Sequence, residues 1–454
     1  MTAASSAAAP PASAALFANG RAAACVGAVA LITMIAFEAL AVAAAMPAVA
    51  AALDGVPYYA LAFGGPLAAS MPGMVLAGRW CDRHGVVRAA AWGLGLFAVG
   101  LLAAGLAQRM PVLVAGRVLQ GLGGGMLGVV LYVGMGQVVP AALHPRLFSL
   151  FATAWVVPGL VGPSLAAWLV VYTNWRWVFL VALAVLPVAA ALLMPAFTKL
   201  PKPPAPSARQ PGAGSRLAWA LAGAAGALLL HGAAGQRWPL LVAGFVLACA
   251  AAWRLLPAGS LRAAPGLPSV IALRGLVAAA FATAEVFMPL ALTRDHGWSL
   301  LQAGWALSTG ALFWSVGSGL QARLSRASAR ERALRVGLAL VSVGITCVAL
   351  AFNWPLPGAL FAVLTIASWA LSGLGVGLAF PILSVQLLKI SAPAEQGRNS
   401  SALQLADALT TTAALAAAGL LVQQAQGSTW VMVFAALLAG TGALCAKRAF
   451  AAGH

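Results

Sequence analysis

The chain has 454 residues, of which 62% are hydrophobic and only 7% are charged, and its mean hydropathy is +0.95. An ordinary soluble domain carries about 25% charged residues, so this composition excludes a water-soluble globular protein. Apolar stretches long enough to cross a ~30 Å hydrocarbon core repeat from Ala22 to the C-terminus. The sequence therefore predicts an all-α membrane protein with many spans.

The net charge of +18 has its origin in the loops of the chain. In a soluble protein it would indicate binding to nucleic acid, but here Asp and Glu total only 8, and Arg and Lys gather in short connections. The positive-inside rule expects this of cytoplasmic loops, so no nucleic-acid partner is predicted. The five cysteines show neither a CxxC pair nor a metal-ligand spacing, and no metal site is predicted.

The first part of the chain predicts one six-helix bundle. Residues 1–21 lack the charged region of a signal peptide and are expected to form a disordered cytoplasmic tail. The N-terminal bundle occupies 22–197, with helices expected at 22–50, 57–78, 89–107, 111–138, 147–171 and 176–197. The Pro-rich stretch 198–215 then predicts a flexible cytoplasmic linker.

The second part of the chain predicts two inserted helices and a second bundle. The inserted pair falls at 216–234 and 238–254 within a segment 216–254, followed by a cytoplasmic loop at 255–268. The C-terminal bundle occupies 269–448, before a tail at 449–454, and its helices are expected at 269–293, 302–322, 335–352, 357–388, 399–422 and 428–446. Every second connection is rich in Arg and Lys, so fourteen spans with both termini cytoplasmic are predicted. Twelve spans would give the same parity.

An internal repeat supports two halves of six helices. The fourth span reads GRVLQGLGGGMLGVV and the twelfth SWALSGLGVGLAFPI, so that Gly121, Gly123 and Gly125 correspond to Gly373, Gly375 and Gly377. A Met-Pro pair also recurs in the first span of each half, at Met46-Pro47 and Met288-Pro289. Such repeats are typical of transporter folds, and the middle helices become an insertion between the halves.

Three acidic residues fall within predicted spans, namely Glu38, Glu285 and Asp407. An ionisable group at the bilayer centre costs at least about 2.5–3.5 kcal/mol, so a functional role is the first hypothesis. Burial favours the protonated form of a carboxyl group, which suits a group that loads and releases a proton. All three are candidates for proton coupling, and Glu38 is predicted to be the main protonation site. The alternatives are a satisfied buried acid for Glu38, hydration near the outer surface for Glu285, and a hydrogen bond to a neighbouring Thr or Ser for Asp407.

Arg117 lies about 10 Å inside the fourth span. It could snorkel to the surface, or face the bundle interior with Gln120 and hold a carboxylate such as Glu38 ionised until substrate or a proton competes for it. The run from Gln120 to Gly125 follows no strand, so it is a helix-packing feature and not a dinucleotide loop. The sequence contains neither a phosphate-binding GxxxxGK[ST] loop nor HExxH, and no catalytic residues are assigned.

These residues together resemble motifs of the major facilitator superfamily, in its fourteen-span drug/proton antiporter branch. The segment GRWCDRHGVVR, from Gly78 to Arg88, is similar to the cytoplasmic loop signature between spans 2 and 3. The resemblance implies a gating charge relay that locks the halves when the transporter is open outward, formed by Gly78, Asp82, Arg83, Gly85 and Arg88. The corresponding loop of the second half, around 319–332, lacks the acid.

Two further motifs complete the resemblance. Arg117, Gln120 and Gly121 match the span 4 motif, whose arginine is associated with proton coupling. Gly159, Gly162 and Pro163 resemble the span 5 antiporter motif, although Ala166 and Ala167 stand where a glycine pair is usual, and the segment 174–179 resembles the drug-antiporter pattern.

The resemblance implies a monomeric drug:proton antiporter of the inner (plasma) membrane, which is not an enzyme. Its partners would be a small-molecule substrate, protons and the lipid bilayer, and the proton gradient would drive it without a cofactor. A facilitator or importer without proton exchange and a transporter-derived sensor are the alternatives.

Overall fold

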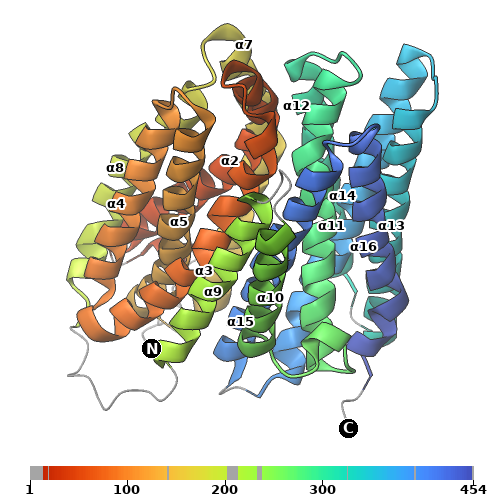
Figure 1. Ribbon diagram of the computed structural model, residues 1–454. Coiled ribbons are helices and arrows are strands. Elements are labelled where there is room, and N and C mark those ends of the chain that lie inside the picture. Colours follow the sequence, from red (N-terminus) through yellow and green to blue (C-terminus); the bar gives the residue numbers. More distant parts are fainter. Residues whose placement is uncertain are drawn as a thin grey trace, which may run out of the picture.

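The computed structural model describes residues 14–18, 20–140, 143–201, 213–232, 238–324, 326–392 and 395–451. Every regular element within these ranges is a helix, which confirms the all-α fold class. Figure 1 shows two helical bundles side by side, with the N-terminal half in red to yellow and the C-terminal half mainly in cyan and blue. Two green helices, α9 and α10, stand in front of the junction between the bundles.

The N-terminal half contains the first six spans, and one of them is interrupted. Its long helices are α2 (Ala22–Ala52), α3 (Tyr59–His84), α4 (Val86–Gly105), α5 (Met110–Val138), α6 (His144–Thr153) with α7 (Val156–Tyr172), and α8 (Trp177–Thr198). The pair α6 and α7 occupies the stretch expected as one helix at 147–171, so the fifth span is divided near Ala154. A short 3-10 turn, Val56–Tyr58, leads into α3.

The expected tail at 1–21 contains a short helix, α1 (Ala14–Phe17). Leu16 is only 4% exposed, and its carbonyl accepts a weak hydrogen bond from the Cys25 thiol at 3.8 Å. The expectation of disorder is therefore wrong for this turn, because Leu16 is an apolar side chain that can be buried against α2. Residues 1–13 and 19 lie outside the described residues.

The middle and C-terminal parts supply the remaining eight spans. The helices are α9 (Ala213–Gly232), α10 (Trp238–Leu255), α11 (Leu267–Arg294), α12 (Leu300–Ala322), α13 (Ala327–Asn353), α14 (Gly358–Ile390), α15 (Gln396–Leu421) and α16 (Gly427–Cys445). Most of the expected linker at 198–215 and the whole tail beyond 451 lie outside the described residues. With α6 and α7 counted as one span, the order is six helices, two and six.

Ten helices of the described chain are long and apolar enough to cross a membrane, and shorter apolar segments lie in α7, α9 and α10, at Val156–Tyr172, Ser215–Leu230 and Pro239–Leu255. The pair α9 and α10 packs together, and α9 also contacts α3 of the N-terminal half and α15 of the C-terminal half. A separate apolar cluster fills this contact, formed by Ala68, Met71, Ala220, Ala224, Ala227, Leu405, Ala408 and Leu409. The inserted helices thus cover one lateral seam between the halves.

Two side-chain hydrogen bonds between the halves lie towards one end of the molecule. We call the end where α2 begins and α16 ends the basic side, because its connections carry most of the Arg and Lys. Towards the opposite side, the buried Tyr59 hydroxyl of α3 donates a hydrogen bond of 2.9 Å to the Val286 carbonyl of α11. The hydroxyls of Ser164 in α7 and Ser308 in α12 share another at 2.8 Å. These contacts join the halves away from the basic side.

Candidate functional site

The structure places Glu38 of α2 and Arg117 of α5 in a buried ion pair. The Arg117 Nη1 atom donates to Glu38 Oε2 at 3.2 Å and to Gln120 Oε1 at 2.8 Å. Glu38 is 3% exposed and Arg117 is 6% exposed, so the arginine does not snorkel to the surface. Glu38 Oε1 and Gln120 Nε2 are buried without a hydrogen-bond partner among the described residues. Arg117 therefore binds one carboxylate oxygen of Glu38, and the other oxygen is left without a hydrogen bond among the described residues.

A proline in α3 supplies the third acceptor for Arg117. Pro66 has no N–H group, so the carbonyl of Ala62, four residues earlier, lacks its usual helical donor. The Arg117 Nε atom donates to this Ala62 carbonyl at 3.2 Å. The guanidinium is thereby fixed by a carboxylate, an amide and a backbone carbonyl from three helices. Both partners of the pair are therefore held in one orientation.

Glycines bring the neighbouring helices close enough for these bonds. Gly121 follows Gln120 in α5, and a Cβ atom there would collide with the backbone of Pro66 in α3. In α7, Gly162 lies beside Phe37 and Ala41, and Gly159 lies beside Leu40 and Ala311. The Gly159, Gly162 and Pro163 motif therefore packs against the turn of α2 that carries Glu38.

The C-terminal half contains a second ion pair, between Arg274 of α11 and Asp407 of α15. The Arg274 Nε atom donates to Asp407 Oδ2 at 3.0 Å, and Nη1 donates to Ser384 Oγ at 2.7 Å and to the Phe380 carbonyl at 3.3 Å. The guanidinium also lies over the Phe380 ring, 3.5 Å from its centroid. The arginine side chain is 14% exposed and the aspartate 23%, so this pair is more accessible than that of Glu38.

The sequence interpretation did not identify Arg274 as the partner of Asp407. The alternative considered for Asp407 was a hydrogen bond to a neighbouring threonine or serine, and in the structure its partner is Arg274. Arg274 lies about 10 Å inside α11, as Arg117 does in α5, so the same rule for charges within a span could have found it.

We expect the Arg274–Asp407 pair to be energetically coupled. Arg274→Gln and Asp407→Asn should each lower the stability of the purified protein, since each leaves a charge without its partner. The loss of unfolding free energy in the double variant should be about 0.5–3 kcal/mol smaller than the sum of the losses in the two single variants, as measured in a double-mutant cycle by thermal unfolding. Ser384→Ala, which removes one hydrogen bond, is the control and should cost only about 1 kcal/mol. A stability loss in the double variant equal to the sum of the two single losses would contradict the coupling.

Glu285 stands apart from the other two intramembrane acids. It is partly exposed, and its carboxylate has neither a hydrogen bond nor an ion pair with any residue in the described ranges. It lies nine residues before the end of α11, about 13 Å along the helix axis, beside the Val286 carbonyl that accepts from Tyr59. The structure therefore brings Glu38 and Arg117 together but leaves Glu285 alone.

The loop signature lies on the basic side, at the junction of α3 and α4. Gly85 joins the two helices with a φ of +85°, a backbone conformation that favours glycine. Asp82, Arg83 and Arg88 are exposed and form no ion pair with other residues of the described chain. The resemblance implied a relay, and in this conformation its charges are not engaged with the C-terminal half.

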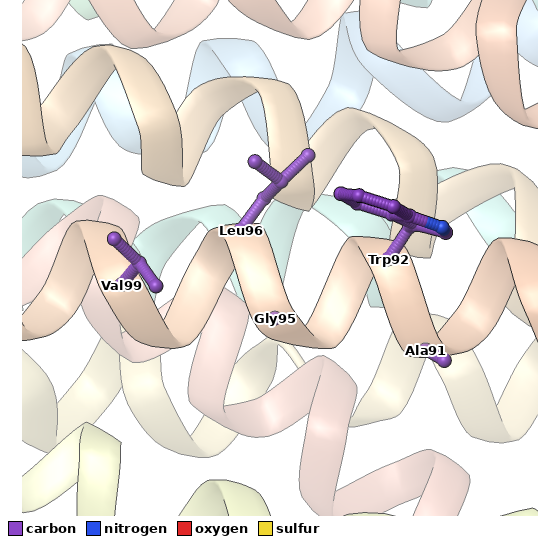
Figure 2. A pocket seen from close by; sticks show the side chains of 5 residues that line it. All are labelled: Ala91, Trp92, Gly95, Leu96 and Val99. Atoms are coloured by element: carbon purple, nitrogen blue, oxygen red, sulfur yellow. The ribbon is translucent and has the colours of Figure 1, made fainter.

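One surface hollow, of about 360 Å³, lies on α4 (Figure 2). It is lined by Ala91, Trp92, Gly95, Leu96 and Val99, none of which is charged. Trp92 and Val99 are among the exposed apolar side chains of the bundle surface. The hollow therefore offers no group for chemistry.

The fold is that of known membrane transporters. An auto-inhibited POT family peptide transporter is similar with a TM-score of 0.70 at 16% identity, over 94% of this chain and 98% of that one. The xylose transporter XylE of E. coli, in an inward-open conformation, gives a TM-score of 0.64 at 14% identity, over 93% and 95%. At such low identity these likenesses establish the fold alone.

The sequence then defines the family. The family model of the Major Facilitator Superfamily matches residues 25–213 and 270–452, and the chain belongs to this superfamily. The break in the match coincides with α9 and α10, as expected of an insertion between two halves. The chain is a membrane transporter and not an enzyme.

Several curated relatives extend the comparison. An "Uncharacterized MFS-type transporter" of Mycobacterium tuberculosis is 37% identical over 134 residues, which are 29% of this chain but only 19% of that protein's length. A "Probable multidrug-efflux transporter" of the same organism is 28% identical over 361 residues, or 74% of each chain. Multidrug resistance protein 3 of Bacillus subtilis is 30% identical over 148 residues, or 33% of this chain and 29% of its own.

Proposed function

We propose that the protein is a proton-coupled antiporter that exports small amphipathic or lipophilic compounds by alternating access. The main support for this proposal is the buried ion pair of Glu38 and Arg117. A proton on Glu38 removes the charge that holds Arg117, and its loss restores the pair. Because the arginine also binds α3 and Gln120, protonation is linked to the packing of the N-terminal half.

The direction of transport is inferred from the relatives. One M. tuberculosis relative that aligns over 74% of both chains is named for multidrug efflux, and the B. subtilis relative is named for multidrug resistance. Gly159 and Gly162 pack against Phe37, Leu40 and Ala41 of the α2 turn that carries Glu38, which agrees with the antiporter motif that the sequence resembles. Driven by the proton gradient, the transporter needs no cofactor, and we propose that it acts as a monomer.

The orientation follows from the loop charges. The positive-inside rule assigns the basic side and both termini to the cytoplasm of a cell whose inner (plasma) membrane holds the protein. Hydrogen bonds join the halves away from that side, which supports assigning the described conformation as inward-facing. In the opposite conformation, the signature residues from Gly78 to Arg88 would contact the C-terminal half and close the cytoplasmic entrance.

Inside-out vesicles provide the test. We expect an inward-acidic gradient to drive accumulation of a lipophilic dye by the wild-type protein, and Glu38→Gln to reduce driven accumulation at least about tenfold because its side chain cannot lose a proton. Asp54→Asn changes an exposed acid outside the pair and should leave driven transport unchanged. Uptake that ignores the gradient would indicate a facilitator, and ligand binding without any transport would indicate a sensor. Either result, or a fully active Glu38→Gln variant, contradicts the proposal.

A further inference from the structure

The connection between α10 and α11 contains a second hollow, which we call the loop hollow. It has a volume of about 200 Å³, and its lining includes Trp253 of α10 and the short 3-10 turn Ser260–Arg262. Pockets for drug-sized ligands usually measure about 300–1,000 Å³, so this one suits a smaller group. The family match stops at residue 213 and resumes at 270, so the loop hollow belongs to the inserted part of the chain.

Three hydrogen bonds attach this connection to the end of the C-terminal bundle. Arg448, in the turn Ala446–Ala449 that follows α16, donates from Nη1 to the carbonyls of Arg262 and Ala263 at 3.3 and 3.4 Å. The Arg448 carbonyl accepts a further bond of 2.9 Å from the N–H group of Gly266. The loop hollow therefore lies on the basic side, where α10 and α16 end and α11 begins.

Two polar groups at the loop hollow lack partners. The Arg262 side chain is exposed and forms neither a hydrogen bond nor an ion pair with the residues that the structure describes. The hydroxyl of Ser260, which also lines the hollow, is buried and has no hydrogen-bond partner within the described ranges. Polar groups buried without a partner are uncommon. A guanidinium and a hydroxyl without acceptors indicate an oxyanion such as phosphate as the ligand.

The sequence around the loop hollow supplies no negative charge. No Asp or Glu occurs between Asp82 and Glu285, a stretch that contains both inserted helices and the whole α10–α11 connection. Arg254 adds a second positive charge near Arg262, and its guanidinium lies over the Trp219 ring of α9, 5.6 Å from the centroid. Basic residues at the ends of membrane helices attract anionic lipids, whose headgroups supply the missing counter-charge.

Apolar side chains at the same place favour a lipid over a free anion. Trp253 and Leu261 both line the loop hollow, and they are 67% and 55% exposed. Tryptophan is enriched at the boundary between the hydrocarbon core and the headgroups. Trp253 lies two residues before the end of α10, which places the loop hollow near that boundary. A molecule with both a phosphate group and acyl chains matches the charged and the apolar parts of this lining.

From these observations we propose that the loop hollow binds the headgroup of an anionic phospholipid, whose phosphate contacts Arg262 beside Ser260 while its acyl chains contact Trp253 and Leu261. The bound lipid fixes the end of the inserted helix pair in the leaflet, while α9 covers the seam between α3 and α15. The site uses none of the intramembrane acids. It therefore goes beyond the proposed antiport and does not depend on the cargo or on proton coupling.

Photo-crosslinking of the purified full-length protein in detergent tests the site. The probe is phosphatidylglycerol with a diazirine near its headgroup, and mass spectrometry maps the labelled peptides. We expect labelling within 252–262 that excess phosphatidylglycerol suppresses but phosphatidylcholine and inorganic phosphate do not. Arg262→Gln should reduce this labelling at least fivefold. Arg323→Gln, which removes an exposed arginine after α12 on the same side, is the matched control and should change it less than twofold.

The competition experiments use the wild-type protein, and thermal unfolding without added lipid verifies that both variants are folded. Equal suppression by phosphatidylcholine would show an apolar contact that does not recognise charge, and equal suppression by inorganic phosphate would show a site for free anions. Equal losses in Arg262→Gln and Arg323→Gln would show a general attraction to positive charge. Each of these results, or no labelling within 252–262, overturns the assignment. Failure of gradient-driven transport would overturn the proposed antiport and leave the lipid site standing.

Discussion

Arg117→Met is expected to destabilise the protein by about 3–5 kcal/mol, the usual cost of removing one partner from a buried ion pair. The substitution leaves the buried Glu38 carboxylate without its donor, and it also removes the donor that serves Gln120 Oε1 and the Ala62 carbonyl. Thermal unfolding of the purified protein measures the loss. Proton-driven dye accumulation in vesicles should fall to background in the same variant.

A second variant separates stability from coupling. Glu38→Gln combined with Arg117→Met removes both charges, so we expect it to recover most of the lost stability but none of the gradient-driven transport. Arg109→Met is the matched control, because Arg109 is exposed at the N-terminal end of the same helix and its loss should change stability by less than about 0.5 kcal/mol. An Arg117→Met variant as stable as wild type, or a double variant that still follows the gradient, would contradict the role of the pair.

The sequence could predict the meeting of Glu38 and Arg117 because both are charged residues in otherwise apolar spans. Such residues avoid lipid, and each needs a partner of opposite charge. Few charged residues within the spans of the N-terminal bundle could therefore serve as partners of each other. In the second half, the sequence identified Asp407 as a charged residue within a span but did not identify Arg274 as its partner. The pair is visible only when α11 and α15 are placed side by side.

Other features depend on helix rotation, which hydropathy does not report. Glu38 was predicted as the main protonation site, with Glu285 and Asp407 as further candidates. The structure separates the three by their surroundings, since Glu285 has no basic partner in the described chain. The use of the Ala62 carbonyl by Arg117 also required the position of α3, although Pro66 signalled that this carbonyl lacks a helical donor. Length and hydropathy were sufficient for the number and order of the helices, but the interruption between α6 and α7 was not expected.

The geometry of the N-terminal site explains why the polar residues Arg117 and Gln120 stand beside small residues in α5. Arg117 and Gln120 form the bonds, and Gly121 permits the close approach of α3 that makes the Ala62 carbonyl reachable. In the second half Gly373 of α14 occupies the corresponding place, where a Cβ atom would collide with the backbone of Gly310 in α12. The repeat therefore preserves the helix crossing in both halves. The charged pair differs, since the arginine lies on α5 in one half and on α11 in the other.

Gly121→Ala is expected to destabilise the protein by about 3 kcal/mol or more, because the added methyl group meets the backbone of Pro66, which cannot rotate away as a side chain could. The helices α3 and α5 would have to separate, and Arg117 would lose its bond to Ala62. Thermal unfolding and the yield of folded monomer in detergent measure the effect. Gly128→Ala in the same helix, where a Cβ atom meets nothing within 4 Å, should be neutral or slightly stabilising, since alanine is the better helix former. Equal stability of the two variants would show that the crossing tolerates a wider spacing and that the position of Arg117 does not depend on Gly121.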